Sequence, residues 1–167
     1  LVFANSKMTS PPRGARPGDC IRHPLILGLL LLWAVNDHLL KSYFANMWTG
    51  KLSDIAGLAV APLLPLCLYE IVCGLRRSEP SHARAVLALS LLTVGSLMVG
   101  INTSAVIGDA YRVGLGALQW PFRCLIPLLT GADTPGLTRV FLTPDPSDLL
   151  TLPALLIPYW VVQQARR

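Results

Sequence analysis

Charged residues are scarce in this sequence, so it lacks the polar surface that a soluble domain of its size needs. Only 14% of its 167 residues are charged, whereas 53% are hydrophobic. Soluble proteins carry roughly 25% charged residues. The deficit argues against an ordinary water-soluble domain, because lipid must cover much of the surface instead. The length suits one compact domain.

Metal-binding and catalytic motifs are missing as well. The four cysteines, Cys20, Cys67, Cys73 and Cys124, form no CxxC pair. No second histidine stands at ligand spacing from His38, so no metal site is predicted. The sequence contains no GxSxG, HExxH, Walker or GxGxxG motif, and neither a cofactor nor a reaction follows from it.

The basic residues lie at the ends of apolar segments rather than along one stripe. The net charge is +5, but a nucleic-acid surface would interleave basic and aromatic residues, so nucleic acid is not expected as a partner. Positive residues beside membrane spans set orientation instead. The flanking arginines are Arg13, Arg16, Arg22, Arg76, Arg77, Arg84, Arg166 and Arg167.

Apolar segments predict an all-α fold, a transmembrane helical bundle of about four spans. The expected spans cover residues 24–43, 53–74, 85–108 and 146–164, each near the roughly 20 residues that cross a bilayer. Pro62 and Pro65 are expected to kink the second span. Gly95 and Gly100 are expected to allow close helix approach in the third.

Two other segments complete the predicted organisation. Residues 9–19 (TSPPRGARPGD) are rich in proline, glycine and arginine, which predicts that residues 1–22 form a disordered cytoplasmic tail. Residues 23–167 then form a single transmembrane domain. Residues 109–130 are apolar but interrupted by Arg112 and Arg123, which predicts an interfacial or re-entrant helix.

The flanking arginines also predict sidedness. If the arginine-flanked ends lie inside, both termini are cytoplasmic, which requires an even number of spans. The opposite ends then share the outer side. Of the nine acidic residues, five fall there: Asp37, Asp54, Asp109, Asp145 and Asp148.

This outer side predicts a polar, carboxylate-rich site, because ionisable groups near a bilayer pair or line a wet cavity. The candidate catalytic residues are Asp37, His38, Asp54 and Asp148. The candidate substrate-binding residues are Asn36, Lys41, Lys51, Ser53, Asp145 and Arg112. The carboxylates would act as bases or cation ligands, the histidine as proton carrier, and the lysines as anion partners.

Each part of this site also has a purely structural interpretation. Asp37 and Lys41 are four residues apart, which suits a simple ion pair on one helix. Ser53 and Asp54 suit a helix start, and residues 145–148 suit a helix cap. The sequence leaves these interpretations open.

Three stretches resemble known proteins. Residues 36–41 (NDHLLK), 49–58 (TGKLSDIAGL) and 145–150 (DPSDLL) resemble a group of uncharacterised small bacterial multi-span membrane proteins. More distantly, an Asp-His pair ending an early helix and DxxDL opening the last one are similar to the VanZ-like family. Its members are small bacterial membrane proteins linked to glycopeptide-antibiotic tolerance. The resemblance implies the bacterial cytoplasmic (inner) membrane and a role in the cell envelope.

Together these features favour an inner-membrane protein that binds or processes an envelope lipid or small amphiphile at its outer face. Membrane lipid is the expected partner. Two other classes stay open: an ion or proton pathway, and a structural or assembly subunit within a homo-oligomer or larger membrane complex.

Overall fold

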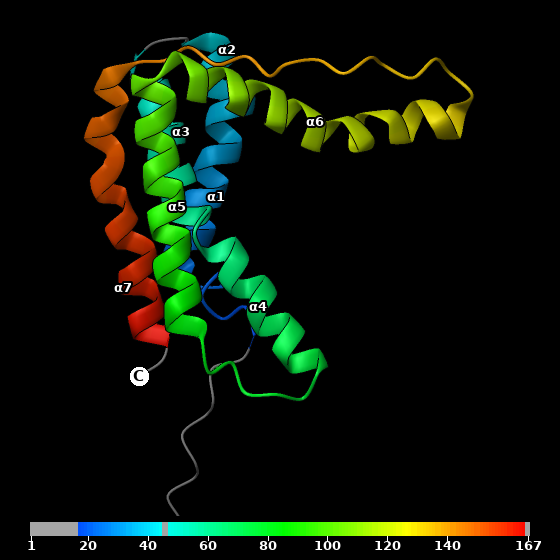
Figure 1. Ribbon diagram of the computed structural model, residues 1–167. Coiled ribbons are helices and arrows are strands. Elements are labelled where there is room, and N and C mark those ends of the chain that lie inside the picture. Colours follow the sequence, from blue (N-terminus) through cyan, green and yellow to red (C-terminus); the bar gives the residue numbers. More distant parts are fainter. Residues whose placement is uncertain (1–16, 45–46, 166–167) are drawn as a thin grey trace, which may run out of the picture.

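The chain is all-helical in the computed structural model, which describes residues 17–44 and 47–165; these residues form no strand (Figure 1). In chain order the helices are α1 (Pro24–Val35), η1 (Asn36–Leu40), α2 (Lys41–Tyr43), α3 (Met47–Val60), α4 (Leu63–Leu75), α5 (Ala83–Thr103), α6 (Ala105–Thr130), η2 (Pro146–Leu155) and α7 (Leu156–Ala165). The predicted all-α class is confirmed.

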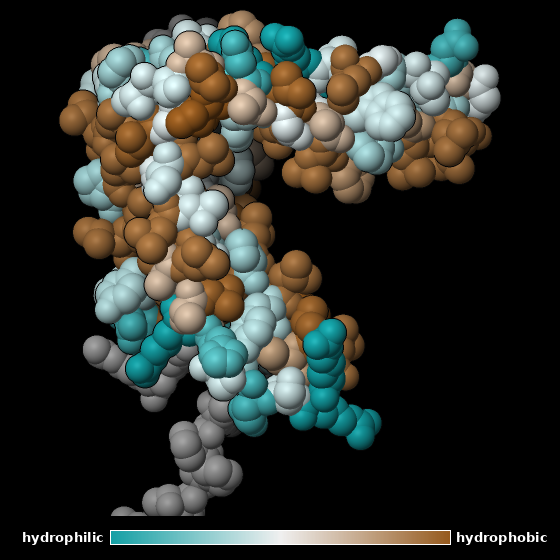
Figure 2. Space-filling view, in the orientation of Figure 1, coloured by the Kyte–Doolittle hydropathy of each residue, from teal (hydrophilic) through white to brown (hydrophobic). Residues whose placement is uncertain are grey.

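Within the described residues, three helices are long and apolar enough to cross a membrane. They are Pro24–Tyr43, Met47–Leu75 and Ala83–Thr103. The last of these is α5, whose 21 residues extend about 31 Å, close to the roughly 30 Å hydrocarbon core of a bilayer. Large apolar side chains also cover the outside of the bundle (Figure 2). Leu31 on α1 and Leu92 on α5, for example, are 66% and 68% exposed.

The first candidate span changes its winding where its polar residues begin. His23 caps α1 by accepting a hydrogen bond from the backbone N–H of Leu25 through Nδ1, and Pro24 occupies the first turn, a position that proline favours. The chain then winds as a π-helix over Asn36–Leu40, where the Lys41 N–H donates to the Asn36 carbonyl. Single π turns inside α-helices are frequent at functional sites.

The second candidate span breaks between α3 and α4, as expected for Pro62. Residues 61 and 62 form a turn, and α4 leans away from α1 beyond it (Figure 1). Pro65 was also expected to kink the span, but it lies in the first turn of α4. Backbone N–H groups have no intrahelical partner there, so a proline disrupts nothing.

The third span ends earlier than the sequence suggested. α5 stops at Thr103 rather than residue 108, and Ser104 adopts an extended backbone that caps α6 through its hydroxyl. The predicted interfacial segment, residues 109–130, is therefore the larger part of a 26-residue helix that begins at Ala105. Its axis runs nearly perpendicular to α5 (Figure 1).

The last helical segment, η2 with α7, lies alongside α5 (Figure 1). It corresponds to the predicted fourth span, but its first ten residues wind as a 3-10 helix that contains Pro153. Gly95 of α5 allows this approach, because a Cβ there would lie 3.0 Å from Leu155 Cδ1. The close contact expected of this glycine is present.

The core joins residues of α1, α3, α4, α5, η2 and α7. Ile26 of α1, Leu63 and Leu66 of α4 and Val161 of α7 are fully buried together. A second cluster includes Leu58 of α3, Met98 of α5 and Ala154 of η2. Between helices surrounded by lipid, such contacts stabilise the bundle through van der Waals packing. These contacts fix α3 between α1 and η2.

The bundle has two chemically different ends. At the polar end meet η1, α2, the start of α3, the end of α5 and the start of η2. At the arginine end meet residues 17–23, the end of α4, the start of α5 and the end of α7 (Figure 1). The acidic residues expected on one side, Asp37, Asp54, Asp109, Asp145 and Asp148, all lie at or beside the polar end.

Residues 1–16 of the predicted disordered tail (residues 1–22) lie outside the described residues. The last part of the tail, residues 17–22, is packed rather than disordered. Gly18 adopts a positive φ of 81°, and its N–H donates to Glu70 Oε2 at 3.2 Å. Cys20 is 4% exposed, and burial raises the pKa of its thiol to about 11. The bundle therefore begins before residue 23.

Residues 132–145 run back along α6 in an extended conformation (Figure 1). The Val140 N–H donates to the Arg112 carbonyl at 3.1 Å. A Cβ on Gly116 would lie 2.2 Å from the Thr138 carbonyl oxygen, so only glycine admits the chain at this point.

Replacement of Gly116 by alanine should therefore displace this segment from α6. We expect a loss of about 1–3 kcal/mol in its docking free energy and faster tryptic cleavage after Arg139 in detergent. Gly114→Ala is the matched control, because a Cβ there meets nothing within 4 Å and alanine favours a helix by up to ~1 kcal/mol. Equal cleavage rates for the two variants would contradict the packing.

Candidate functional site

Asn36 is the centre of a hydrogen-bond network at the polar end. Its side chain is fully buried, and Nδ2 donates to the Thr49 carbonyl and to Ser53 Oγ, both at 2.7 Å. Ser53 in turn donates to Asp37 Oδ1 at 2.6 Å. Lys41 Nζ lies 2.7 Å from the same oxygen. The network joins the π turn of the first span to the start of the second.

The other side-chain atom of Asn36 is unsatisfied. Among the described residues, Asn36 Oδ1 is the one buried side-chain oxygen or nitrogen without a hydrogen-bond partner. A buried acceptor without a donor costs about 1–3 kcal/mol. A water or a donor group of a bound molecule would satisfy it.

Lys51 links α3 to the start of η2. Its Nζ donates to Ser147 Oγ at 2.7 Å and to Asp148 Oδ1 at 3.1 Å. The two charged side chains are only 13% and 20% exposed, whereas those of Lys41 and Asp37 are 40% and 38% exposed. An exposed pair contributes roughly 0–1 kcal/mol, and a better shielded pair is stronger.

Asp54 lies close enough to Asp148 for the two carboxyl groups to interact electrostatically. It forms no salt bridge with another residue in the described part of the chain. Its side chain is half-buried. A shielded carboxylate next to a second one favours a cation or a hydrogen-bond donor in its vicinity.

Asp145 caps η2. Its Oδ1 accepts the Ser147 N–H at 2.8 Å, and its own N–H donates to Asn102 Oδ1 of α5 at 2.9 Å. The Ser147 N–H holds the pKa of this carboxyl below its usual range. The structural interpretation, a helix cap, therefore applies to Asp145.

An apolar groove opens beside these polar groups. It has a volume of about 340 Å³. Ser53, Asp54 and Tyr111 lie at its polar end, and burial raises the pKa of the Tyr111 hydroxyl, which therefore remains a hydrogen-bond donor. Its remaining walls are almost wholly apolar: Trp33, Gly57, Leu58, Ala61, Val94, Leu97, Met98, Ile101 and Leu142.

Of the ten predicted site residues, Ser53 and Asp54 line this groove, and two others, His38 and Arg112, also lie outside the hydrogen-bonded groups around Asn36 and Lys51. His38 is exposed and lines a separate shallow pocket of about 270 Å³ with Asp37 and Trp33. Arg112 pairs with Asp109 at 3.1 Å and donates to the Leu142 carbonyl. It holds residues 132–145 against α6 and does not belong to the group of side chains around Lys51.

The other eight predicted site residues form two adjoining groups. Asn36, Asp37, Lys41 and Ser53 share one network, and Lys51, Asp54, Asp145 and Asp148 gather around the start of η2. In the described part of the chain, no three histidine, cysteine or acidic side chains are arranged to hold a metal ion.

Sequence reasoning missed three residues that shape the site. Ser147 receives the Lys51 hydrogen bond, Asn102 holds the backbone of Asp145, and Tyr111 closes the groove. Ser147 stands inside the DPSD motif, where its position next to a cap was the available signal. Nothing in the sequence indicates that Asn102 would bind the backbone of Asp145.

Comparison of the chain with protein-family models, with curated proteins and with solved structures gives no match. The resemblance to the VanZ-like family stays a prediction.

Asn36→Ala should destabilise the protein by about 1–2 kcal/mol, because it removes the two hydrogen bonds that Nδ2 donates to the Thr49 carbonyl and to Ser53 Oγ. The measurement is the free energy of reversible unfolding in mixed detergent micelles. Ser42→Ala is the control, since Ser42 makes one exposed bond within its own helix and should change stability by less than about 0.5 kcal/mol. Equal losses would refute the importance of the buried network.

Proposed function

We propose that the protein binds an envelope lipid or small amphiphile at its polar end. The headgroup lies against Ser53, Asp54 and Tyr111, and the chain lies in the apolar groove below them. The observation that carries this proposal is the composition of the groove, which has a half-buried carboxylate at one end and apolar walls elsewhere. Ligand sites combine apolar walls with a few oriented polar groups in this way.

The charges of the groove define the headgroup that it suits. Asp37 and Asp148 are each paired with a lysine, but Asp54 forms no salt bridge with a described residue. An ammonium group, or a headgroup with several hydrogen-bond donors, complements this carboxylate. The proposal is one of binding, because His38 lies in another pocket and supplies no proton carrier beside Asp54.

The proposed location is the bacterial inner membrane, with the polar end outside and both termini in the cytoplasm. The described arginine-end residues Arg22, Arg76, Arg77 and Arg84 support this orientation by the positive-inside rule. The η2–α7 segment serves as the fourth span. Its 3-10 half extends about 20 Å and its α half about 15 Å, enough to cross roughly 30 Å.

α6 is proposed to lie in the outer interface. The face of α6 that points toward the level of the arginine end is largely apolar in Figure 2, and α6 carries exposed apolar residues such as Phe122, Ile126 and Leu129. A helix with one apolar and one polar side suits this position.

An ion or proton pathway is less well supported. Buried polar side chains of the described residues include Asn36, Thr49 and Asn102 at the polar end and Glu70 toward the other end. Between them lie Ser90 and Thr151, whose hydroxyl groups do not ionise. A pathway would need a continuous polar lining.

Photolabelling tests the headgroup. The probes are a diazirine-bearing dodecylammonium and a dodecanoate with the same diazirine chain, added to the purified protein in detergent. We expect the ammonium probe to label the groove saturably and Asp54→Asn to weaken its binding about tenfold, equivalent to ~1.4 kcal/mol. Asp109→Asn, which alters an exposed carboxylate outside the groove, should leave labelling unchanged. Labelling that is insensitive to Asp54→Asn contradicts the proposal.

A steric pair of variants tests the apolar part. Gly57 lines the groove and Gly50 does not, yet both lie on α3 and a Cβ on either meets nothing within 4 Å. Gly57→Leu should fill the groove and abolish saturable labelling without loss of stability. Gly50→Leu should label like the unmodified protein. Equal labelling by the two variants would place the ligand elsewhere.

A further inference from the structure

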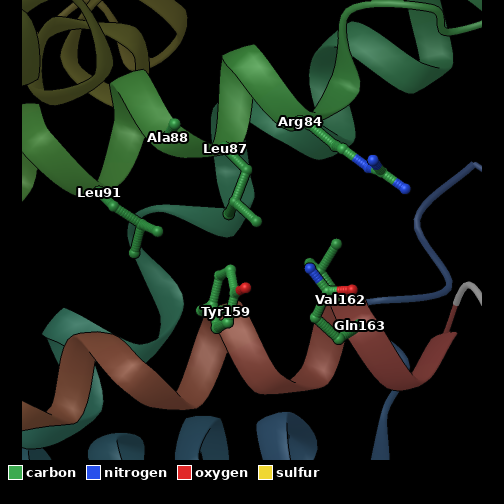
Figure 3. A pocket seen from close by; sticks show the side chains of 7 residues that line it. All are labelled: Arg84, Leu87, Ala88, Leu91, Tyr159, Val162 and Gln163. Carbon is green, nitrogen blue, oxygen red and sulfur yellow. The ribbon is translucent and has the colours of Figure 1, made fainter.

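A second groove lies at the arginine end, between α5 and α7. It has a volume of about 420 Å³. Figure 3 shows side chains of both helices facing the gap between them. The lining residues are Arg84, Leu87, Ala88, Leu91, Tyr159, Val162 and Gln163. None of them belongs to the polar-end site.

The floor of this groove is apolar and its mouth is polar. Leu87 and Val162 are 4% and 3% exposed and form the floor. Arg84 and Gln163 lie toward the end of the bundle, in the first turn of α5 and the last turns of α7. From Arg84 to Leu91 the groove follows α5 for about 10 Å, so a polar headgroup at the mouth continues into an apolar chain.

The charge at the mouth selects the headgroup. Arg84 is exposed and forms no salt bridge with another described residue. A guanidinium group binds phosphate oxygens in a bidentate manner. Arg76 and Arg77 end α4 at the same end of the bundle and add to the positive potential there. Basic pockets between helices at a membrane surface bind anionic lipid headgroups.

We propose that this groove binds an anionic phospholipid of the leaflet that surrounds the arginine end. The phosphate lies at Arg84, the Gln163 amide and the Tyr159 hydroxyl contact the headgroup and glycerol oxygens, and one acyl chain packs over Leu87 and Leu91. This site is separate from the polar-end groove and takes a ligand of the opposite charge.

Lipid retention measured by native mass spectrometry tests the site on the full chain. The probes are dioleoylphosphatidylglycerol, dioleoylphosphatidylcholine and inorganic phosphate, each added to protein purified in uncharged detergent. We expect the anionic lipid to be retained at least about fivefold better than the zwitterionic one, a modest difference of free energy. Arg84→Gln should weaken its retention about tenfold, whereas Arg76→Gln should change it less than about twofold.

A groove-filling variant keeps the test valid if Arg84→Gln fails to fold. Ala88→Leu occupies the groove and leaves every charge in place, and it should reduce retention of the anionic lipid. Ala85→Leu is its control, because Ala85 is also exposed on α5 but does not line the groove.

Three results would overturn the proposal. Equal retention of both lipids would show that the headgroup charge is not recognised. Competition by inorganic phosphate as effective as that by the anionic lipid would indicate a phosphate site without a lipid chain. A change from a dimeric to a monomeric mass in Ala88→Leu, without a change in lipid retention, would show that a second copy of the chain occupies the groove.

Discussion

The arrangement of the polar end depends on the contact of Lys51 with Ser147 and Asp148. These residues are almost a hundred positions apart in the chain, and their contact ties η2 to α3. α3 packs against α1 on its other side, so the one contact brings the carboxylates of η2 beside Asp54. Without it, Asp148 would no longer be held beside Asp54, which lies at the polar end of the groove.

The same contact explains how a membrane protein can keep so many ionisable groups near one end. A lone charge near lipid is costly, and pairing or hydrogen bonding offsets that cost. Asp37, Asp109 and Asp148 are each paired, and Asp145 accepts the backbone N–H of Ser147. Asp54 is the exception in the groove. It forms no salt bridge with a described residue, although Lys41 and Lys51 lie near enough to act on it electrostatically, and it is the carboxylate to which the proposed headgroup is assigned.

Composition and proline positions predicted much of the fold, because both act locally. The scarcity of charge predicted the apolar helices, and Pro62 predicted the break between α3 and α4. Pro65 was misjudged because its effect depends on where the next helix begins. The return of residues 132–145 along α6 could not be foreseen, since it depends on a contact between Gly116 and a distant carbonyl. The hydrogen bond between Gly18 and Glu70 could not be predicted either, because it also joins distant parts of the chain.

The sequence predicted which residues belong to the candidate site, but it did not predict which of them pair with one another. The predicted side of the membrane was enough to place Asp37, Lys51, Asp54 and Asp148 near one another. It could not show that Lys41 and Lys51 pair with different carboxylates. His38 and Arg112 shared the predicted side and still lie apart from the groove, because helix rotation and the position of α6 decide which way a side chain faces. The apolar groove itself has no sequence signal, since its walls come from four separate segments.

A double-mutant cycle on Lys51 and Asp148 tests the central contact most directly. The free energies of unfolding of Lys51→Met, Asp148→Asn and the double variant are compared with that of the unmodified protein in mixed micelles. The shielded contact predicts a coupling energy of about 1–3 kcal/mol. A coupling energy indistinguishable from zero would mean that η2 is not held to α3 by this pair, and it would contradict the role of the pair in placing Asp148 beside Asp54.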